Sequence, residues 1–225
     1  STPLYSSAAS DVYKRQVLAN SVVSSTLLRA MARDAGREHQ TTLTGFKWIG
    51  RVQNLAFGYE EAIGYCCDPQ AVPDKDGISA AMTVLRITAE LKAEGKTIQN
   101  RLDDIARYYG VYATSQLAVR VADLSIIAQA MAKLRDNPPT TLLDEPVTVV
   151  DLLPGSPELP PTDAIELTGQ RVHVVARPSG TEPKLKCYLE VRMDPADDVS
   201  RSRDAAADLL RRLREEMAEA LGVEE

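Results

Sequence analysis

The chain has 225 residues, of which 44% are hydrophobic and 26% are charged, and its net charge is −6 at pH 7. This length predicts one large or two ordinary globular domains. The acidic balance argues against nucleic acid or a membrane surface as the main partner, because both attract clustered Lys and Arg. No stretch of the sequence reaches the ~18 consecutive apolar residues that span a bilayer. We therefore expect a cytoplasmic protein whose partner is a small molecule.

The cysteines and histidines fit neither a disulfide framework nor a transition-metal site. Cys66 and Cys67 are adjacent, and Cys187 falls in an expected strand. The only two histidines, His39 and His173, are isolated from each other and from any C-x-x-C pair. A zinc site requires Cys or His at ligand spacing. We expect three free thiols and no metal bound by this chain.

Residues 1–16 differ in character from the rest of the chain. They are rich in Ser and Ala and show no sustained hydrophobic period. They also resemble translated adapter sequence, which is excluded from reasoning about a fold. We expect residues 1–16 to be a non-native or disordered leader, and the first apolar, strand-like segment begins at Val17.

Residues 17–137 alternate between strand-like and helix-like patterns. The expected strands are 17–24, 38–42 and 55–57, and the expected helices are 26–35, 46–53, 78–93, 98–109 and 117–134. Strands that alternate with helices favour a parallel sheet covered on both faces. We expect an α/β domain with a mixed, largely parallel sheet.

A breaker cluster at 136–139, Asp-Asn-Pro-Pro, ends the last of these helices and suits a linker. We therefore place a domain boundary between residues 137 and 138. Beyond it, strand patterns and one long amphipathic pattern predict a smaller α+β domain, residues 138–225, with an antiparallel sheet and a C-terminal helix. The expected strands are 147–153, 164–167, 171–176 and 185–191, and the helix is 199–221.

The most informative motif is a short turn, Arg-Pro-Ser-Gly-Thr-Glu-Pro, that begins at Arg177. Arg177 can offer a planar fork of donors to phosphate oxygens, and Ser179 and Thr181 add hydroxyl donors. Gly180 lets backbone N–H groups turn toward an anion, and Lys186 adds a second positive charge. Pro, Ser and Gly also favour an ordinary hairpin turn for local reasons. The residues of this turn leave both interpretations open.

Three further segments carry polar side chains in loops. Lys47 lies in the first turn of an expected helix, where open α/β sheets collect ligands, but it also fits an ordinary surface lysine. Glu60 and Glu61 follow a strand and could accept hydrogen bonds from sugar hydroxyls, or simply decorate a loop. Asp76, in the segment Asp-Lys-Asp-Gly, is an expected N-cap of the following helix.

These motifs occur in an order that resembles the third and fourth domains of the α-D-phosphohexomutase family. The motifs are Gly45-Phe46-Lys47, the Glu60-Glu61 loop, Asp74-Lys75-Asp76-Gly77 and Arg177-Pro-Ser-Gly-Thr-Glu-Pro-Lys. The resemblance covers essentially all of 17–225. The sequence Tyr-Glu-Glu-Ala-Ile-Gly-Tyr around Glu60 is most similar to that of the phosphoglucomutase/phosphopentomutase branch.

The resemblance implies a role for individual residues of the last domain. Arg177, Ser179, Gly180 and Thr181 match the loop that holds the non-reacting phosphate of the substrate. Lys186 stands where the family usually has arginine, so it offers a point charge instead of a bidentate fork.

The resemblance also implies a sugar-binding loop in the preceding domain. Glu60 matches the residue that contacts hydroxyls of the sugar ring, and Ala62 stands where many members have serine. Lys75 and Asp76 match a loop that lines the same cleft. Lys47 matches a lysine near the reacting groups, and its implied role is acid/base or electrostatic catalysis.

The family interconverts phosphorylated hexoses or pentoses through a phosphoserine and Mg²⁺. Neither the serine loop nor the metal loop of the family occurs in this sequence. We therefore expect the carboxyl half of an isomerase that binds the sugar and the non-reacting phosphate but is inactive without N-terminal catalytic domains. The alternatives are a stand-alone sugar-phosphate-binding module, or specificity for mannose phosphates.

Overall fold

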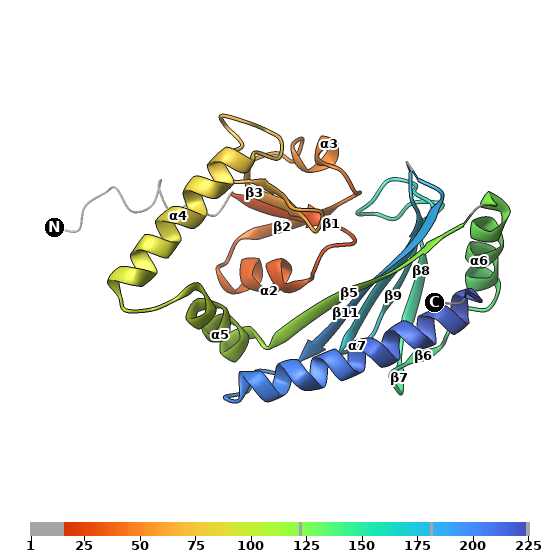
Figure 1. Ribbon diagram of the computed structural model, residues 1–225. Coiled ribbons are helices and arrows are strands. Elements are labelled where there is room, and N and C mark those ends of the chain that lie inside the picture. Colours follow the sequence, from red (N-terminus) through yellow and green to blue (C-terminus); the bar gives the residue numbers. More distant parts are fainter. Residues whose placement is uncertain (1–15, 122, 181, 224–225) are drawn as a thin grey trace. The chain divides into compact units, whose positions relative to one another are not determined.

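The computed structural model describes residues 16–121, 123–180 and 182–223. The chain divides into two compact units, residues 1–102 and 103–225, and the division falls within one helix. Each unit contains its own sheet, as Figure 1 shows by the colours along the chain. The expected leader lies almost wholly outside the described residues.

The first unit is built on a four-stranded sheet of order β2-β1-β3-β4. β1 pairs in parallel with both β2 and β3, whereas β3 and β4 form an antiparallel hairpin. The strands are β1 (Val17–Ser21), β2 (Glu38–Thr42), β3 (Leu55–Glu60) and β4 (Gly64–Cys66). The helices are α2 (Leu27–Asp34), α3 (Phe46–Ile49), α4 (Gly77–Ala93) and α5 (Ile98–Tyr109).

The strand order explains why α2 and α3 cover opposite faces of this sheet (Figure 1). The chain moves one way from β1 to β2 and back past β1 to reach β3, and right-handed crossovers then place the two helices on opposite sides. A small core of apolar residues joins β1 to α3 and its neighbours. Its buried members are Val17, Ala19, Phe46, Ile49, Val52 and Cys66.

Helix α4 contributes little to this core. The sequence places Ile78, Met82 and Leu85 on one apolar stripe, but these side chains are 80%, 64% and 63% exposed, and Leu91 is the buried residue of the helix. The helix begins where the sequence predicts, because the Asp76 carboxylate accepts hydrogen bonds from the N–H groups of Ile78 (3.0 Å) and Ser79 (3.1 Å).

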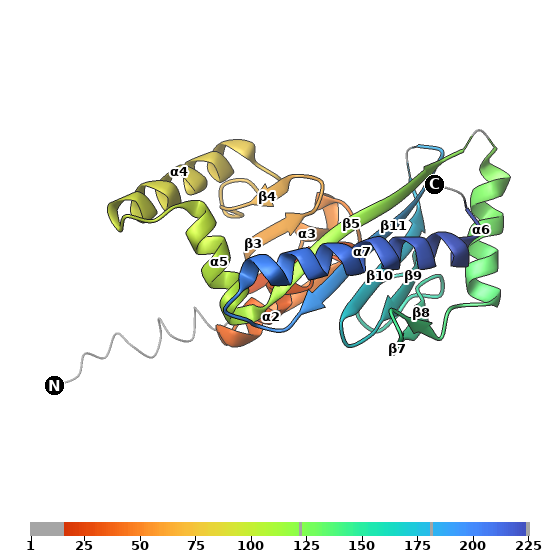
Figure 2. The ribbon, with the colours of Figure 1, turned by 60° about the horizontal axis from the view of Figure 1, so that its bottom comes forward.

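The second unit is an antiparallel five-stranded sheet of order β5-β11-β10-β9-β8, with α7 packed along β5 and β11 (Figure 2). Buried side chains of the sheet, α6 and α7 form one continuous core. The strands are β5 (Val111–Arg120), β8 (Thr148–Asp151), β9 (Ile165–Thr168), β10 (Val172–Pro178) and β11 (Lys184–Met193), with a small hairpin of β6 (Thr141–Leu142) and β7 (Glu145–Pro146). The helices are α6 (Leu124–Asp136) and α7 (Val199–Leu221).

The expected fold class is confirmed for both units, but two local predictions are wrong. The helix expected over 117–134 is a strand up to Arg120, and α6 begins only after Asp123, which caps it by accepting from the Ser125 N–H at 2.8 Å. β5 pairs with β11 over ten residues, and this non-local partner overrides the local helical pattern.

The boundary expected between residues 137 and 138 also lies elsewhere. The division of the chain falls between Leu102 and Asp103, because β5 and α6 both pack within the second unit. The Asp-Asn-Pro-Pro cluster ends α6 inside this unit instead of separating two domains. A breaker stops a helix wherever it occurs, so it marks a domain boundary only when no core continues beyond it.

Candidate functional site

The expected site residues fall in two groups, one in each unit, and each group is described within its own unit. The first group surrounds the end of β3. Glu60, the last residue of β3, is 8% exposed, and its Oε1 atom lies 2.7 Å from the Nζ atom of Lys75. The hydrogen bond to Glu60 raises the pKa of Lys75. The structure therefore joins two residues that the sequence only placed in separate loops.

Packing around this ion pair fixes the Glu60 side chain. Lys75 Nζ also lies 5.9 Å from the centroid of the Phe46 ring, within the range of a cation–π contact. Gly64 on β4 lies against the same two groups, and a Cβ atom there would come within 2.6 Å of Phe46 and 2.7 Å of Glu60. The carboxylate is thus confined on several sides, with its second oxygen free of any ion pair to the described residues.

Lys47 lies next to this group on the short helix α3. Gly45, the N-cap of α3, has φ of 104°, a conformation that favours glycine and lets the chain enter the helix at this angle. The Lys47 side chain is exposed, and its Nζ atom lies 5.7 Å from the centroid of the Trp48 ring. No carboxylate of the described residues forms an ion pair with Lys47, so its ammonium group is available to a ligand.

The turn between β3 and β4 contains Ala62, whose methyl group is exposed and offers no hydrogen bond. Glu61 in the same turn was not singled out for a separate role by the sequence. Its Oε2 atom accepts from Ser21 (3.4 Å) and Ser24 (3.3 Å) at the end of β1, and these two hydroxyls lie 2.8 Å apart. Glu61 therefore ties the turn to β1 while Glu60 points toward Lys75.

The carboxylate of Asp76 caps a helix, so its role in this structure is to stabilise the fold. Hydrogen bonds from Ser79 and from the N–H of Ile78 lower the pKa of its carboxyl group. Both of its oxygens are used in capping α4. Because Lys75 precedes this cap, Asp76 fixes the backbone from which Lys75 reaches Glu60.

The second group lies on the β10–β11 hairpin. Arg177 on β10 is directly opposite Lys186 on β11, so their side chains share one face of the sheet. The next residue across this ladder is Ala118 of β5, whose methyl group is too small to cover them. No carboxylate among the described residues forms an ion pair with either cation. Two adjacent positive charges that form no ion pair with a described carboxylate are a suitable site for an anion.

The turn beyond these cations is closed by a hydrogen bond from the Ser179 N–H to the Lys184 carbonyl (2.8 Å). Gly180 is exposed, with open space where a Cβ atom would lie, and Thr181 lies outside the described residues. Glu182 turns away to Lys184 (2.9 Å) and Arg120 (3.1 Å), and the hydrogen bond from Lys184 lowers its pKa. Glu182, the acidic residue of the motif, therefore forms its ion pairs with Lys184 and Arg120 and not with Arg177.

Magnesium, which the resemblance implies, finds no fitting residues in the described parts of the chain. No group of three or more His, Cys, Asp or Glu side chains there could hold a metal ion. The three cysteines are free thiols, as the sequence predicts. Among the described helices, none has both the length and the apolar character needed to cross a membrane.

Comparison with protein families identifies both units. The model of the phosphoglucomutase/phosphomannomutase alpha/beta/alpha domain III matches residues 4–109, and the model of the C-terminal domain of the same family matches residues 117–220. The first match begins inside the expected leader. Together the two matches cover almost the whole chain and meet near the division between the units.

Individual relatives give the same result. A probable phosphomannomutase of Haemophilus influenzae is 42% identical over 82% of this chain and 38% of its own length. A phosphoglucomutase of Staphylococcus aureus is 28% identical over 85% of this chain and 39% of its own length. The chain thus spans about two fifths of the length of these relatives.

Solved structures share the fold at low identity. Parafusin, a phosphoglucomutase of Paramecium, has a TM-score of 0.69 at 18% identity, covering 92% of this chain and 39% of its own. A phosphoglucomutase/phosphomannomutase family protein of Burkholderia thailandensis has a TM-score of 0.60 at 16% identity, covering 95% of this chain and 39% of its own.

Proposed function

Because the chain belongs to the phosphoglucomutase/phosphomannomutase family, we propose that it is the substrate-holding part of a phosphosugar mutase. Such an enzyme interconverts the 1-phosphate and the 6- or 5-phosphate of a sugar. In this proposal the chain binds the sugar and the phosphate that does not react. The transfer itself requires the phosphoserine and metal loops of N-terminal domains that this sequence does not include.

The observation that carries the proposal is the pair of cations on the β10–β11 hairpin. Arg177 and Lys186 lie opposite each other with no carboxylate partner among the described residues. A phosphate dianion would satisfy both charges, and Ser179, Gly180 and Thr181 would supply further donors from the turn. A hairpin turn needs no such pair of cations for its own stability.

Glu60 supports the same proposal from the first unit. Lys75 occupies its Oε1 atom, which holds the carboxylate in place and leaves Oε2 to accept hydrogen bonds from sugar hydroxyls. The Ala62 methyl group in the same loop offers the sugar no hydroxyl partner, so the hydrogen bonding there falls mainly to Glu60. Lys75 and Asp76 would act by orienting this loop, and Lys47 would stabilise charge or transfer a proton beside it.

A mutase benefits when one group of residues binds the phosphate and a separate carboxylate binds the sugar. The sugar bisphosphate must turn around between its two phosphoryl transfers, so the protein must hold similar ligands in two orientations. A clamp that recognises only the phosphate accepts either end of the molecule. Glu60 can likewise accept hydrogen bonds from vicinal hydroxyls in either orientation.

The sugar has two candidates. The motif around Glu60 favours the phosphoglucomutase/phosphopentomutase branch, whereas the relative at 42% identity is named a probable phosphomannomutase. Titration of the chain with glucose 1-phosphate, ribose 1-phosphate and mannose 1-phosphate compares them directly. A preference for mannose 1-phosphate of tenfold or more would reject the branch that the motif indicates.

The decisive experiment is calorimetric titration of the 225-residue chain and its Arg177→Ala variant with glucose 1-phosphate. Loss of a charge-assisted hydrogen bond should weaken binding by at least ~1.5 kcal/mol, about tenfold in Kd. Arg211→Ala is the matched control, because Arg211 is an exposed arginine of α7 in a surface pair with Asp208. Equal affinities of wild type and Arg177→Ala would reject the phosphate clamp, and mutase turnover by the chain alone would show that the chemistry lies elsewhere than proposed.

A further inference from the structure

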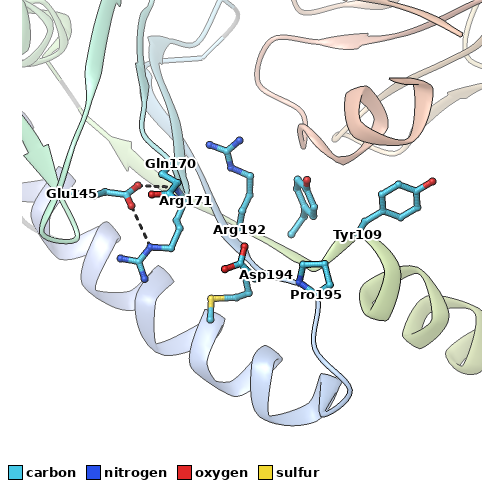
Figure 3. Close-up of a pocket in the computed structure, with 9 residues that line it drawn as sticks. Tyr109, Glu145, Gln170, Arg171, Arg192, Asp194 and Pro195 are labelled. Atoms are coloured by element: carbon cyan, nitrogen blue, oxygen red, sulfur yellow. Dashed lines mark hydrogen bonds and ion pairs between the residues drawn. The ribbon is translucent and has the colours of Figure 1, made fainter. Parts of the chain in front are cut away.

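A cavity of about 440 Å³ lies within the second unit, at the end of the sheet where β10 begins and β11 ends (Figure 3). The Arg177 turn lies at the other end of β10. Seven strand residues at about 3.3 Å each separate the two places by about 20 Å. The cavity is therefore distinct from the phosphate turn, and its volume falls in the usual range for small-molecule sites.

Arg192 places a positive charge in the wall of this cavity. Its Nη2 atom donates to the carbonyls of Gly169 (2.6 Å) and Val172 (3.2 Å), which fixes the side chain in place. Its Nε atom is buried and has no hydrogen-bond partner. No carboxylate of the described residues forms an ion pair with Arg192.

The neighbouring arginine differs in this respect. Arg171 forms an ion pair with Glu145 (Nε to Oε2, 3.2 Å), and the Glu145 carboxylate also accepts from the Arg171 N–H at 2.8 Å. Figure 3 shows both bonds as dashed lines. The charge of Arg171 is thus compensated within the protein, and Arg192 is the cation of the cavity wall that a bound anion would neutralise.

The other walls of the cavity suit the remaining parts of a nucleotide. Tyr109 and Tyr112 contribute aromatic rings, on which a base can stack. Asp194, which is exposed, contributes carboxylate oxygens that can accept hydrogen bonds from sugar hydroxyls. Inorganic phosphate could bind Arg192 but would lack the contacts that a base and a ribose make with the tyrosines and Asp194.

We propose that this cavity binds a nucleoside monophosphate, with the phosphate on Arg192, the ribose hydroxyls on Asp194 and the base against the tyrosines. This site is independent of the sugar-phosphate function proposed above. It lies within one unit, so its occupancy does not require other domains.

Calorimetric titration of the 225-residue chain with AMP tests the proposal. AMP should bind, adenosine should bind at least tenfold more weakly because it lacks the phosphate, and a tenfold excess of inorganic phosphate should not displace AMP. Absence of AMP binding at millimolar concentration overturns the proposal. Equal affinities for AMP and adenosine overturn the role of Arg192.

Variants at Gln170 test the location without removing a structural contact. Gln170 lies in the exposed turn beside the cavity (Figure 3). Gln170→Glu should weaken AMP binding and Gln170→Lys should strengthen it, each by about twofold to fivefold, because the added charge repels or attracts the phosphate. Thermal melting of each variant confirms that the fold is retained. Equal AMP affinities in the two variants overturn the assignment to this cavity.

Arg177→Gln separates this site from the phosphate turn. If AMP occupies the cavity, its affinity in this variant equals that of the wild type, even where binding of glucose 1-phosphate is lost. If AMP binding is lost in Arg177→Gln and unchanged in both Gln170 variants, AMP occupies the turn and the proposal is wrong.

Discussion

The ion pair between Lys75 and Glu60 leads to a prediction about the stability of the first unit. Replacing Lys75 by Met keeps most of the aliphatic stem but leaves the Glu60 carboxylate without its partner. The Glu60 side chain is 10% exposed and that of Lys75 is 51% exposed. An unpartnered buried carboxylate costs about 1–3 kcal/mol, and the half-exposed lysine reduces the loss because water already screens the pair. We expect Lys75→Met to lower the free energy of unfolding by about 1–2 kcal/mol at pH 7.

The protonation state of Lys75 determines how the stability contributed by this ion pair depends on pH. The hydrogen bond to Glu60 raises the pKa of Lys75 above its ordinary value of 10.5. The contribution is therefore fully present below the unfolded pKa, including pH 7, and is lost as the pH rises through the higher folded pKa.

The assay is urea unfolding followed by the fluorescence of Trp48, the single tryptophan of the chain, which lies in the first unit. The matched control is Lys96→Met, since Lys96 forms an exposed pair with Glu94 at 3.6 Å and should contribute less than about 0.5 kcal/mol. The double variant Glu60→Gln/Lys75→Met should be more stable than the sum of the two single effects predicts, by about 1 kcal/mol. Equal losses in Lys75→Met and Lys96→Met, or additive single effects, would refute the reasoning.

Two further predictions concern a partly buried histidine and a constrained glycine. Burial and the charge of Arg29 lower the pKa of His39 from 6.5 to about 4. The free energy of unfolding should therefore keep its highest value above pH 6.5, where His39 is neutral in both the folded and the unfolded state. It should fall by about 1–3 kcal/mol as the pH drops toward 4, because the unfolded state binds the proton more readily. Trp48 unfolding curves of wild type and His39→Gln between pH 7 and 4.5 measure this, and equal pH dependence would contradict it. Gly110→Ala should lower the stability of the second unit by more than about 2 kcal/mol, because φ is 90° and the new Cβ would lie 2.0 Å from the Met193 carbonyl oxygen. Thermal melting followed by circular dichroism checks this, and an unchanged Tm would reject it.

Much of the fold could be predicted from local sequence patterns. The alternation of strands and helices after Val17 and the apolar stripe of residues 199–221 gave correct elements with errors of a few residues at their ends. These patterns arise from burial on one face of a helix or strand, which the sequence records directly. The Asp76 cap was predictable for the same reason, since a cap depends on neighbours within four residues.

The errors concern elements that depend on distant partners. Residues 117–120 contain alanine and leucine and continue into a true helical pattern, yet they pair with β11 about 70 residues later in the chain. β4 was missed because three residues carry too little pattern to reveal a strand, and it forms only by pairing with β3. Neither partner can be read from the residues of the strand itself.

The candidate site was predictable in its residues but not in its contacts. The short distance from Lys75 to Glu60 could not be read from the sequence, and neither could the hydrogen bonds from Ser21 and Ser24 to Glu61. A signal for the second contact was present in the cluster of serines that ends β1, because carboxyl ends of neighbouring parallel strands meet at one edge of a sheet. β1 and β3 are such neighbours, so hydroxyls at the end of one strand can reach a carboxylate at the end of the other.

The Arg177 motif shows why a turn and an anion site need not be alternatives. The sequence left a hairpin turn and a phosphate clamp both open, and the structure confirms the hairpin by pairing seven residues of β10 with β11. The same pairing brings Arg177 and Lys186 opposite each other, which neither residue could achieve alone. The Ser179–Lys184 hydrogen bond closes the turn just beyond the two cations. The antiparallel ladder is therefore the physical reason for the concentrated charge, and a register shift of one residue would move one cation to the other face.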